Sequence, residues 1–208
     1  RRKYDQALDS YESALKLEPD LVAAHVNAAM AFNAKGRNRK AEKSLRQATA
    51  LDPNGVPARL NLAMLVAEMG RKDESETLFD QVLQTDPNNA TAAYNLAILK
   101  GENNPAKAVE LCQRAAKAAP GVGKYAYTLA FYLQKNGETD RAVDVLEKLV
   151  RTGRNFEAVI LLGDIYARTG KTEKAANLYQ DHIQRDYLSQ RQIQYLARKL
   201  RQLGQAGN

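Results

Sequence analysis

Apolar residues follow a helical spacing along most of this chain, and the same arrangement returns at regular intervals. One example runs from Ala48 to Ala63, where the phrase Leu-Asp-Pro-Asn separates two apolar segments, and close variants occur around Pro19 and Pro87. Within the segments, apolar residues are spaced roughly i, i+4 and i+7, which places them on one face of a helix. No segment alternates with the period of two that is typical of a half-buried strand, so the pattern predicts an all-α chain.

The prolines and glycines define the length of the repeating unit. Pro19, Pro53 and Pro87 are 34 residues apart, and Pro120 follows 33 residues later. Because proline cannot continue a helix, each of these positions predicts the end of a unit. A glycine recurs inside most units and separates two helical segments: Gly36, Gly70, Gly137, Gly170 and Gly204. The chain is therefore expected to be an array of helix pairs.

Residue size also recurs within each unit. The first helix carries a large residue followed by a small one, as in Leu62-Ala63 and Leu162-Gly163. Such a pair lets one side chain pack while a neighbouring helix approaches the backbone. The second helix carries a small residue and then a larger one four positions later, as in Ser75 and Phe79.

These features resemble the tetratricopeptide repeat family, and the resemblance covers essentially the whole chain. It is clearest in residues 56–89, which contain the family positions Leu62, Ala63, Gly70, Ser75, Phe79, Val82 and Pro87. The resemblance implies a right-handed α-solenoid of helix-turn-helix repeats. One family feature is absent, because the position of an early aromatic residue is occupied here by His25, Arg59, Ala93, Ala126 and Val159.

We expect a single repeat array over residues 1–208. Residues 1–21 are predicted to be the second helix of a truncated repeat, and residues 190–208 a C-terminal capping helix with a polar outer face. The full repeats are predicted at 22–55, 56–89, 90–122, 123–155 and 156–189. The sequence begins at Arg1 without an initiator Met, so we interpret it as a fragment or a processed chain.

Residues suited to catalysis or metal binding are few. Cys112 is the single cysteine, which excludes intramolecular disulfides and multi-cysteine metal sites. His25, His182 and Cys112 fall at packing positions of the repeat, and no carboxylate pair accompanies the histidines. The turn Pro120 to Lys124 lacks the first glycine and the Ser or Thr of a phosphate-binding loop. We therefore predict no enzymatic activity, no cofactor and no metal site.

The resemblance implies that the first helices line a concave groove, and one polar residue recurs on them. Asn27, Asn61 and Asn95 are 34 residues apart. A side-chain amide offers donors and an acceptor, so a row of amides can bind the backbone of an extended peptide. We predict that the groove binds an extended peptide or a helix of a protein partner. The alternative is that asparagine is simply common at this position of the family.

Apolar side chains are predicted to supply further contacts in the same groove. The candidates are Met30, Met64, Tyr94, Tyr127 and Phe131. The alternative is that they pack against neighbouring first helices. The two interpretations are balanced for Met30, Met64 and Tyr127, whereas packing in the core is favoured for Tyr94 and Phe131 and for the nearby Val26, Leu60 and Ile98.

The formal net charge of +7 is unevenly distributed. Residues 185–208 contain five basic residues and one acidic residue, and Arg168 and Arg198 are predicted on the groove side. This end of the chain therefore favours an acidic segment of a partner. The basic cluster from Lys35 to Arg46 is explained by a solvated turn and helix face. Nucleic acid is a disfavoured partner, because no aromatic series is interleaved with the basic residues.

The apolar runs are only a few residues long, so membrane insertion is not expected, and no feature assigns a compartment. The predicted function is a non-catalytic scaffold for protein binding. Two alternatives remain open. The chain is an interaction arm of a larger enzyme or cofactor-carrying protein, or it is a module for homo-oligomeric assembly through self-association.

Overall fold

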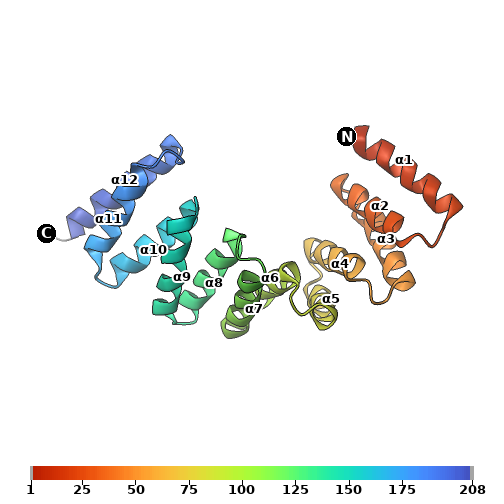
Figure 1. The fold of residues 1–208 in the computed structure, drawn as a ribbon, viewed down its shortest axis with the longest axis horizontal. Coiled ribbons are helices and arrows are strands. Elements are labelled where there is room, and N and C mark those ends of the chain that lie inside the picture. The colour runs from red at the N-terminus through yellow and green to blue at the C-terminus, as the bar shows by residue number, and fades with distance from the viewer. Residues whose placement is uncertain (1, 207–208) are drawn as a thin grey trace. The chain divides into compact units, whose positions relative to one another are not determined.

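A computed structural model describes residues 2–206 of the chain, and this range contains helices and no strands. The chain divides into two compact units, residues 1–99 and 100–208 (Figure 1). The first unit contains α1 (Arg2–Leu17), α2 (Val22–Ala34), α3 (Asn38–Leu51), α4 (Val56–Glu68), α5 (Lys72–Thr85) and most of α6 (Ala90–Lys100). The second contains α7 (Pro105–Ala118), α8 (Gly123–Lys135), α9 (Thr139–Thr152), α10 (Phe156–Arg168), α11 (Thr172–Ile183) and α12 (Gln190–Ala206). The all-α prediction is confirmed, and the assignment of residue ranges to individual repeats stays a prediction.

Most of the helices pack against a neighbour in the chain, and several also contact the next helix but one. In the first unit, α2 contacts α1, α3 and α4. In the second unit, α8 contacts α7, α9 and α10, and α10 also contacts α11 and α12. The even-numbered helices therefore touch one another within a unit, in the pairs α2–α4, α8–α10 and α10–α12. None of the helices in the described part of the chain is long and apolar enough to cross a membrane.

Four turns between paired helices depend on glycine. Gly36, Gly70, Gly137 and Gly170 have φ values between 71° and 83°, which is the left-handed region that other residues rarely adopt. At the first of these turns, the N–H of Arg37 donates to the carbonyl of Phe32 at 2.8 Å, which satisfies one of the last carbonyls of α2. Four of the five glycines singled out in the sequence therefore close helix pairs. The prediction was wrong for Gly204, which lies within α12.

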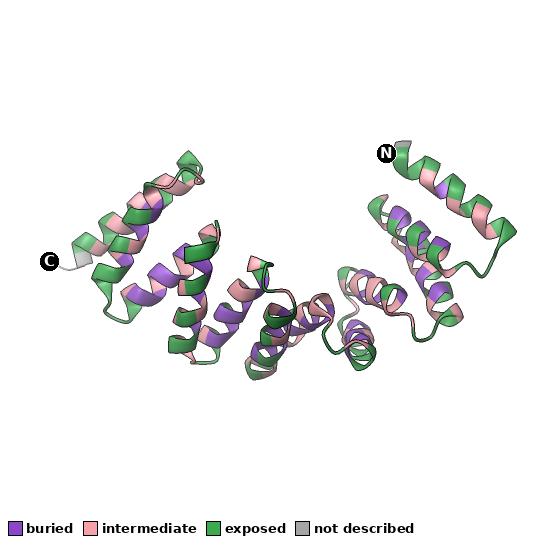
Figure 2. Cartoon of the chain, in the orientation of Figure 1, coloured by how far each residue is buried: buried purple, intermediate pink, exposed green. Residues whose placement is uncertain are grey.

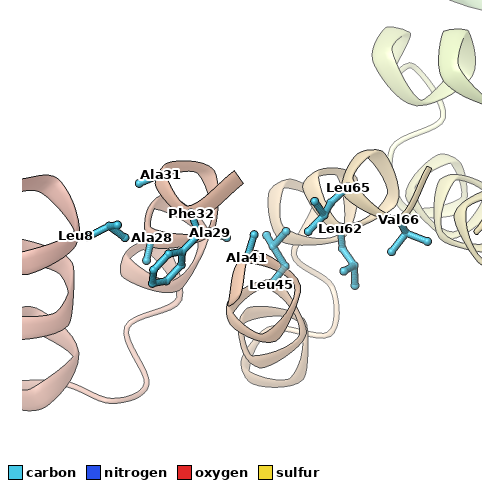
Figure 3. Packing of buried hydrophobic residues seen from close by; sticks show 10 residues of the cluster. All are labelled: Leu8, Ala28, Ala29, Ala31, Phe32, Ala41, Leu45, Leu62, Leu65 and Val66. Carbon is cyan, nitrogen blue, oxygen red and sulfur yellow. The ribbon is translucent and has the colours of Figure 1, made fainter. Parts of the chain in front are cut away.

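Small residues bring the helices of the first unit together around an apolar core. Ala29 and Ala63 are almost fully buried, and the surrounding cluster includes Leu8 of α1, Leu45 of α3 and Val66 of α4 (Figure 3). Next to Ala63, the buried hydroxyl of Ser75 donates to the Ala63 carbonyl at 2.9 Å. A small residue at each of these positions therefore permits close contact between helices.

Buried residues also recur along the helices of the second unit, whereas the helices at both ends of the chain are largely exposed (Figure 2). Among the residues whose burial is described, α1 buries only Leu8 and α12 buries only Leu196. In α8, the buried Tyr132 lies against Gly101, where any Cβ atom would collide with the phenol ring. These contacts fix how α8 packs on the segment that leads into α7.

A cluster of four charged side chains joins two helix pairs of the first unit. The Arg71 guanidinium, at the start of α5, donates to both carboxylate oxygens of Glu42 in α3, at 2.7 and 3.0 Å. Arg46 of α3 donates to Glu42 at 2.7 Å and to Glu74 of α5 at 2.5 Å. Hydrogen bonds from the Arg71 guanidinium, more than any other factor, lower the pKa of Glu42 to about 2.

Candidate peptide-binding surface

The three asparagines predicted to bind peptide backbone lie on α2, α4 and α6 of the first unit. Asn27 is exposed, and Asn61 and Asn95 are half-buried. The side-chain amide of Asn61 donates to the Pro57 carbonyl at 2.9 Å, and that of Asn95 donates to the Thr91 carbonyl at 2.8 Å. These bonds within each helix hold the amide nitrogen against the backbone. These bonds use the amide nitrogen, so the Oδ1 atom of each side chain is the acceptor that the amide offers to a ligand.

Apolar side chains accompany the asparagines on these helices. Met30 is 56% exposed and Ile98 is 45% exposed, whereas Met64 and Tyr94 are half-buried. Val26 and Leu60 are also half-buried. The preference for core packing was therefore wrong for Ile98, because apolar character alone does not reveal whether another helix covers a side chain.

Charged residues are scarce on these helices. Helix α2 contains no Asp, Glu, Lys or Arg, and α6 contains only Lys100 at its last position. In α4 the charges are Arg59, near the start, and Glu68, at the end. The carboxylate of Glu68 accepts a hydrogen bond from Asn33 at 3.2 Å. The middle of each helix is thus uncharged, and the exposed apolar atoms are not interrupted by solvated ions.

The remaining four predicted residues lie on helices of the second unit. Tyr127 and Phe131 are on α8, Arg168 ends α10, and Arg198 is on α12. Phe131 is 42% exposed, so its predicted burial was wrong, and its ring edge contacts Tyr132 with 5.3 Å between centroids. Partial burial, and to a smaller extent the negative charge of Glu157, raise the pKa of Tyr127. Both arginines are exposed on helices that belong to the contacting series α8, α10 and α12.

The hollows described in the structure lie away from the predicted residues, and two of them illustrate this. One of about 660 Å³ is beside the turn between α2 and α3, where it is lined by Arg37, Arg39, Lys40 and Met69 among others. Another, of about 520 Å³, is bordered by α7, α8 and α9. None of the ten residues predicted from the sequence lines either hollow. A hollow requires both a small side chain and the absence of a covering group, and only the first of these can be recognised in the sequence.

Two titratable side chains, Cys112 and His182, are almost completely buried. The thiol of Cys112 is fully buried, and burial raises its pKa to about 12. His182 is 1% exposed, its Nδ1 donates to the Leu178 carbonyl at 2.9 Å, and burial lowers its pKa. Within residues 2–206, no cluster of three or more His, Cys, Asp or Glu side chains is arranged to hold a metal ion. Cys112 and His182 are thus both buried, which agrees with the packing positions that the repeat assigned to them.

Comparison with solved structures shows the same type of fold. YrrB has a TM-score of 0.72 at 18% identity, covering 86% of this chain and 95% of YrrB. PilF of Pseudomonas aeruginosa has a TM-score of 0.72 at 19% identity, covering 95% and 99%. MamA of Desulfovibrio magneticus RS-1 has a TM-score of 0.70 at 17% identity, covering 86% and 96%. No curated protein sequence matches the chain.

Family comparison agrees with the repeat pattern and the helix pairs. Two family models, both described as Tetratricopeptide repeat, match this chain. One matches residues 1–54 and 32–98, and the other matches residues 127–187. Together with the all-helical solenoid fold of the similar structures, these matches show that the chain belongs to the tetratricopeptide repeat family.

Proposed function

We propose that this chain is a non-catalytic protein-binding scaffold, and that the exposed sides of α2, α4 and α6 bind an extended peptide or a helix of a partner. The observation that carries the proposal is the combination of exposed Met30 and Ile98 with recurring asparagines on helices whose middles carry no charge. Exposed apolar groups that are not interspersed with charges are typical of interaction surfaces. A solvated surface helix would instead carry charged residues on its outer face.

The asparagines are expected to give the site its preference for peptide backbone. Their Oδ1 atoms can accept hydrogen bonds from backbone N–H groups, which every residue except proline provides. Each such bond contributes about 0.5–1.5 kcal/mol, so three contribute roughly 1.5–4.5 kcal/mol. A micromolar complex requires about 8 kcal/mol, and the apolar side chains must therefore supply the larger part.

The second unit, taken by itself, carries candidate binding residues of a different chemistry. Tyr127 and Phe131 of α8 provide aromatic surface, and Arg168 and Arg198 provide exposed positive charge on α10 and α12. An acidic segment of the partner is the ligand that these arginines favour. In the fold comparison, YrrB is described as a TPR protein with an unusual peptide-binding site, which supports a peptide as the class of ligand.

Selection of binders from a displayed random-peptide library, followed by calorimetric titration, tests the proposal. Selected peptides should bind the wild-type chain. Replacement of Asn27, Asn61 and Asn95 together by Ala should weaken binding at least about tenfold, while the melting temperature stays unchanged. Equal affinity for the two proteins would reject the asparagine contacts.

Light scattering over a dilution series gives the complementary measurement. A scaffold that binds peptides through α2, α4 and α6 should remain monomeric at all concentrations. Concentration-dependent dimers that peptide does not dissociate would contradict the proposal and favour homo-oligomeric assembly.

A further inference from the structure

The hollow bordered by α7, α8 and α9 has a mainly apolar lining. Its volume of about 520 Å³ lies within the range of about 300–1,000 Å³ that is usual for ligand pockets. The apolar lining residues are Ala116, Pro120, Ala126, Leu129, Val145 and Leu149. All of them belong to the second unit, and they come from α7, α8, α9 and the connection before α8.

The hollow lies beside a repeat position at which two other repeats of the chain carry a long polar side chain. His25 follows Pro19 by six residues, and its Nε2 atom donates to the Pro19 carbonyl at 2.8 Å. Arg59 follows Pro53 by six residues, and its guanidinium donates to the Pro53 carbonyl. In both repeats the side chain therefore reaches back over the connection that precedes its helix.

Ala126 has the same relation to Pro120, but its methyl group is too short to reach the proline carbonyl. The other two residues at this repeat position, Ala93 and Val159, are each only 1% exposed. Ala126 is half-buried and lines the hollow. Of the five residues at this position, all of which the structure describes, Ala126 is the small side chain that is left uncovered. The hollow thus adjoins the repeat position at which an arginine or a histidine stands elsewhere in the chain.

Positive charges flank the hollow. Lys117 of α7 and Lys148 of α9 line it, and both are exposed. We propose that the hollow binds a Phe- or Leu-sized side chain from an acidic segment of a partner protein. The apolar floor takes the side chain, and the two lysines attract the neighbouring carboxylates.

This site is separate from the surface proposed above, from which it takes only the premise that the ligand is a protein segment. Ala126 and Leu129 are three positions apart and share one face of α8. Tyr127 and Phe131 are four positions apart and share another face. Substitutions at the two sites therefore test the two proposals independently.

Titration of the full ¹⁵N-labelled chain with the peptide acetyl-Phe-Asp-Asp-amide tests the inference. We expect saturable chemical-shift changes centred on the amides of Ala126, Leu129 and Leu149. Replacing the peptide Phe by Ala should weaken binding about tenfold, because most of the buried apolar surface is lost. Replacing both peptide Asp residues by Asn should weaken it about two- to fivefold. This second difference should disappear in the Lys117→Gln/Lys148→Gln double variant.

Filling the hollow provides the decisive variants. Ala126→Arg and Ala126→His should abolish the saturable shifts without lowering the melting temperature, because each introduced side chain can bond the Pro120 carbonyl as Arg59 and His25 bond theirs. The matched control is Ala106→Arg, at an exposed position of α7 that does not line the hollow, and this variant should bind the peptide as the wild type does. The inference is overturned if no saturable shift appears up to the solubility limit. It is equally overturned if the Phe and Ala peptides bind alike, or if the filled variants retain binding.

Discussion

The phenol ring of Tyr179 in α11 occupies the space that a Cβ atom on Gly163 of α10 would need. Both residues are buried, and the Tyr179 hydroxyl donates to Asp164 at 3.1 Å. The same carboxylate accepts a hydrogen bond from Lys199 of α12 at 2.7 Å. The earlier repeats have Ala at the position of Gly163. At the position of Tyr179 they have a smaller residue, such as Leu146 or Cys112. The absence of a side chain at Gly163 therefore leaves room for the larger ring of Tyr179.

This relationship predicts a sign reversal between two backgrounds. Gly163→Ala should destabilise the wild type, because overpacking costs about 1–3 kcal/mol and the higher helix propensity of alanine offsets only about 1 kcal/mol. In the Tyr179→Leu background the same change should be stabilising, since the ring is gone. Urea denaturation of the four proteins measures both effects. A loss of stability from Gly163→Ala in both backgrounds would show that Tyr179 is not the obstacle.

The contact between Arg71 and Glu42 predicts a pH-dependent contribution to stability. Because the folded-state pKa of Glu42 is lowered from 4.5 to about 2, this contribution is present above about pH 4.5 and is lost as the pH falls towards about 2. Glu42→Gln should therefore lower the free energy of unfolding by about 1 kcal/mol at pH 7, with little effect near pH 2. Denaturation curves at several pH values test this expectation.

Glu110 provides the control for this measurement. It forms an exposed ion pair with Lys107 within α7, at 2.7 Å. Glu110→Gln should change the stability by no more than about 0.5 kcal/mol at any pH. A Glu42→Gln effect that is constant from neutral to acid pH would exclude the charge interaction as its cause.

Leu62 and Ala63, the large and small residues of the pair in α4, predict two different losses of folding stability at adjacent positions. Leu62→Ala should cost about 2–5 kcal/mol by leaving a cavity in the core of the first unit. Ala63→Leu should cost about 1–3 kcal/mol, because Ala63 is fully buried and has no room for a larger side chain. Thermal melts compare both with Ala50→Leu, at an exposed position of α3. If both core variants melted with the wild type, the assignment of this helix face would be wrong.

The apolar part of the proposed peptide surface predicts graded losses of affinity. Met30→Ala and Met64→Ala should each weaken a selected peptide by about 1–2 kcal/mol, or roughly 5- to 30-fold, with unchanged melting temperature. Leu17→Ala is the control, because Leu17 on α1 is 84% exposed and lies outside the proposed surface. Calorimetric titration measures all three, and equal losses in the three variants would indicate that contact with these helices is non-specific.

The helix pairs could be predicted from the sequence because their signals are local. Gly70 has a left-handed φ of 80°, and α5 ends at Thr85, two residues before Pro87. The turn and the helix end each follow from the backbone conformations that a single glycine or proline allows. The contact between Gly101 and Tyr132 could not be predicted in this way. It depends on two residues that are far apart in the chain and on the way in which α8 packs.

The binding surface was predicted less completely than the fold. Asn27, Asn61 and Asn95 repeat at a fixed interval and could be recognised, whereas the bonds from Asn61 and Asn95 to their own helices depend on side-chain rotamers. In the sequence, Ala126 was noted only as one of the residues at the position where the early aromatic residue of the family is absent. Its significance required the structure, in which His25 and Arg59 bond the proline carbonyl six residues earlier and Ala126 lines a hollow.

The four glycine turns would also accept a residue of the opposite chirality. Nothing lies within 4 Å of the position that a Cβ atom would take on Gly36, Gly70, Gly137 or Gly170, yet their positive φ values disfavour every L-residue. A mirror-image residue prefers this backbone conformation. D-alanine introduced at one of these turns by chemical synthesis would therefore fit without strain, and it would reduce the freedom of the unfolded chain by the equivalent of about 0.4–1 kcal/mol.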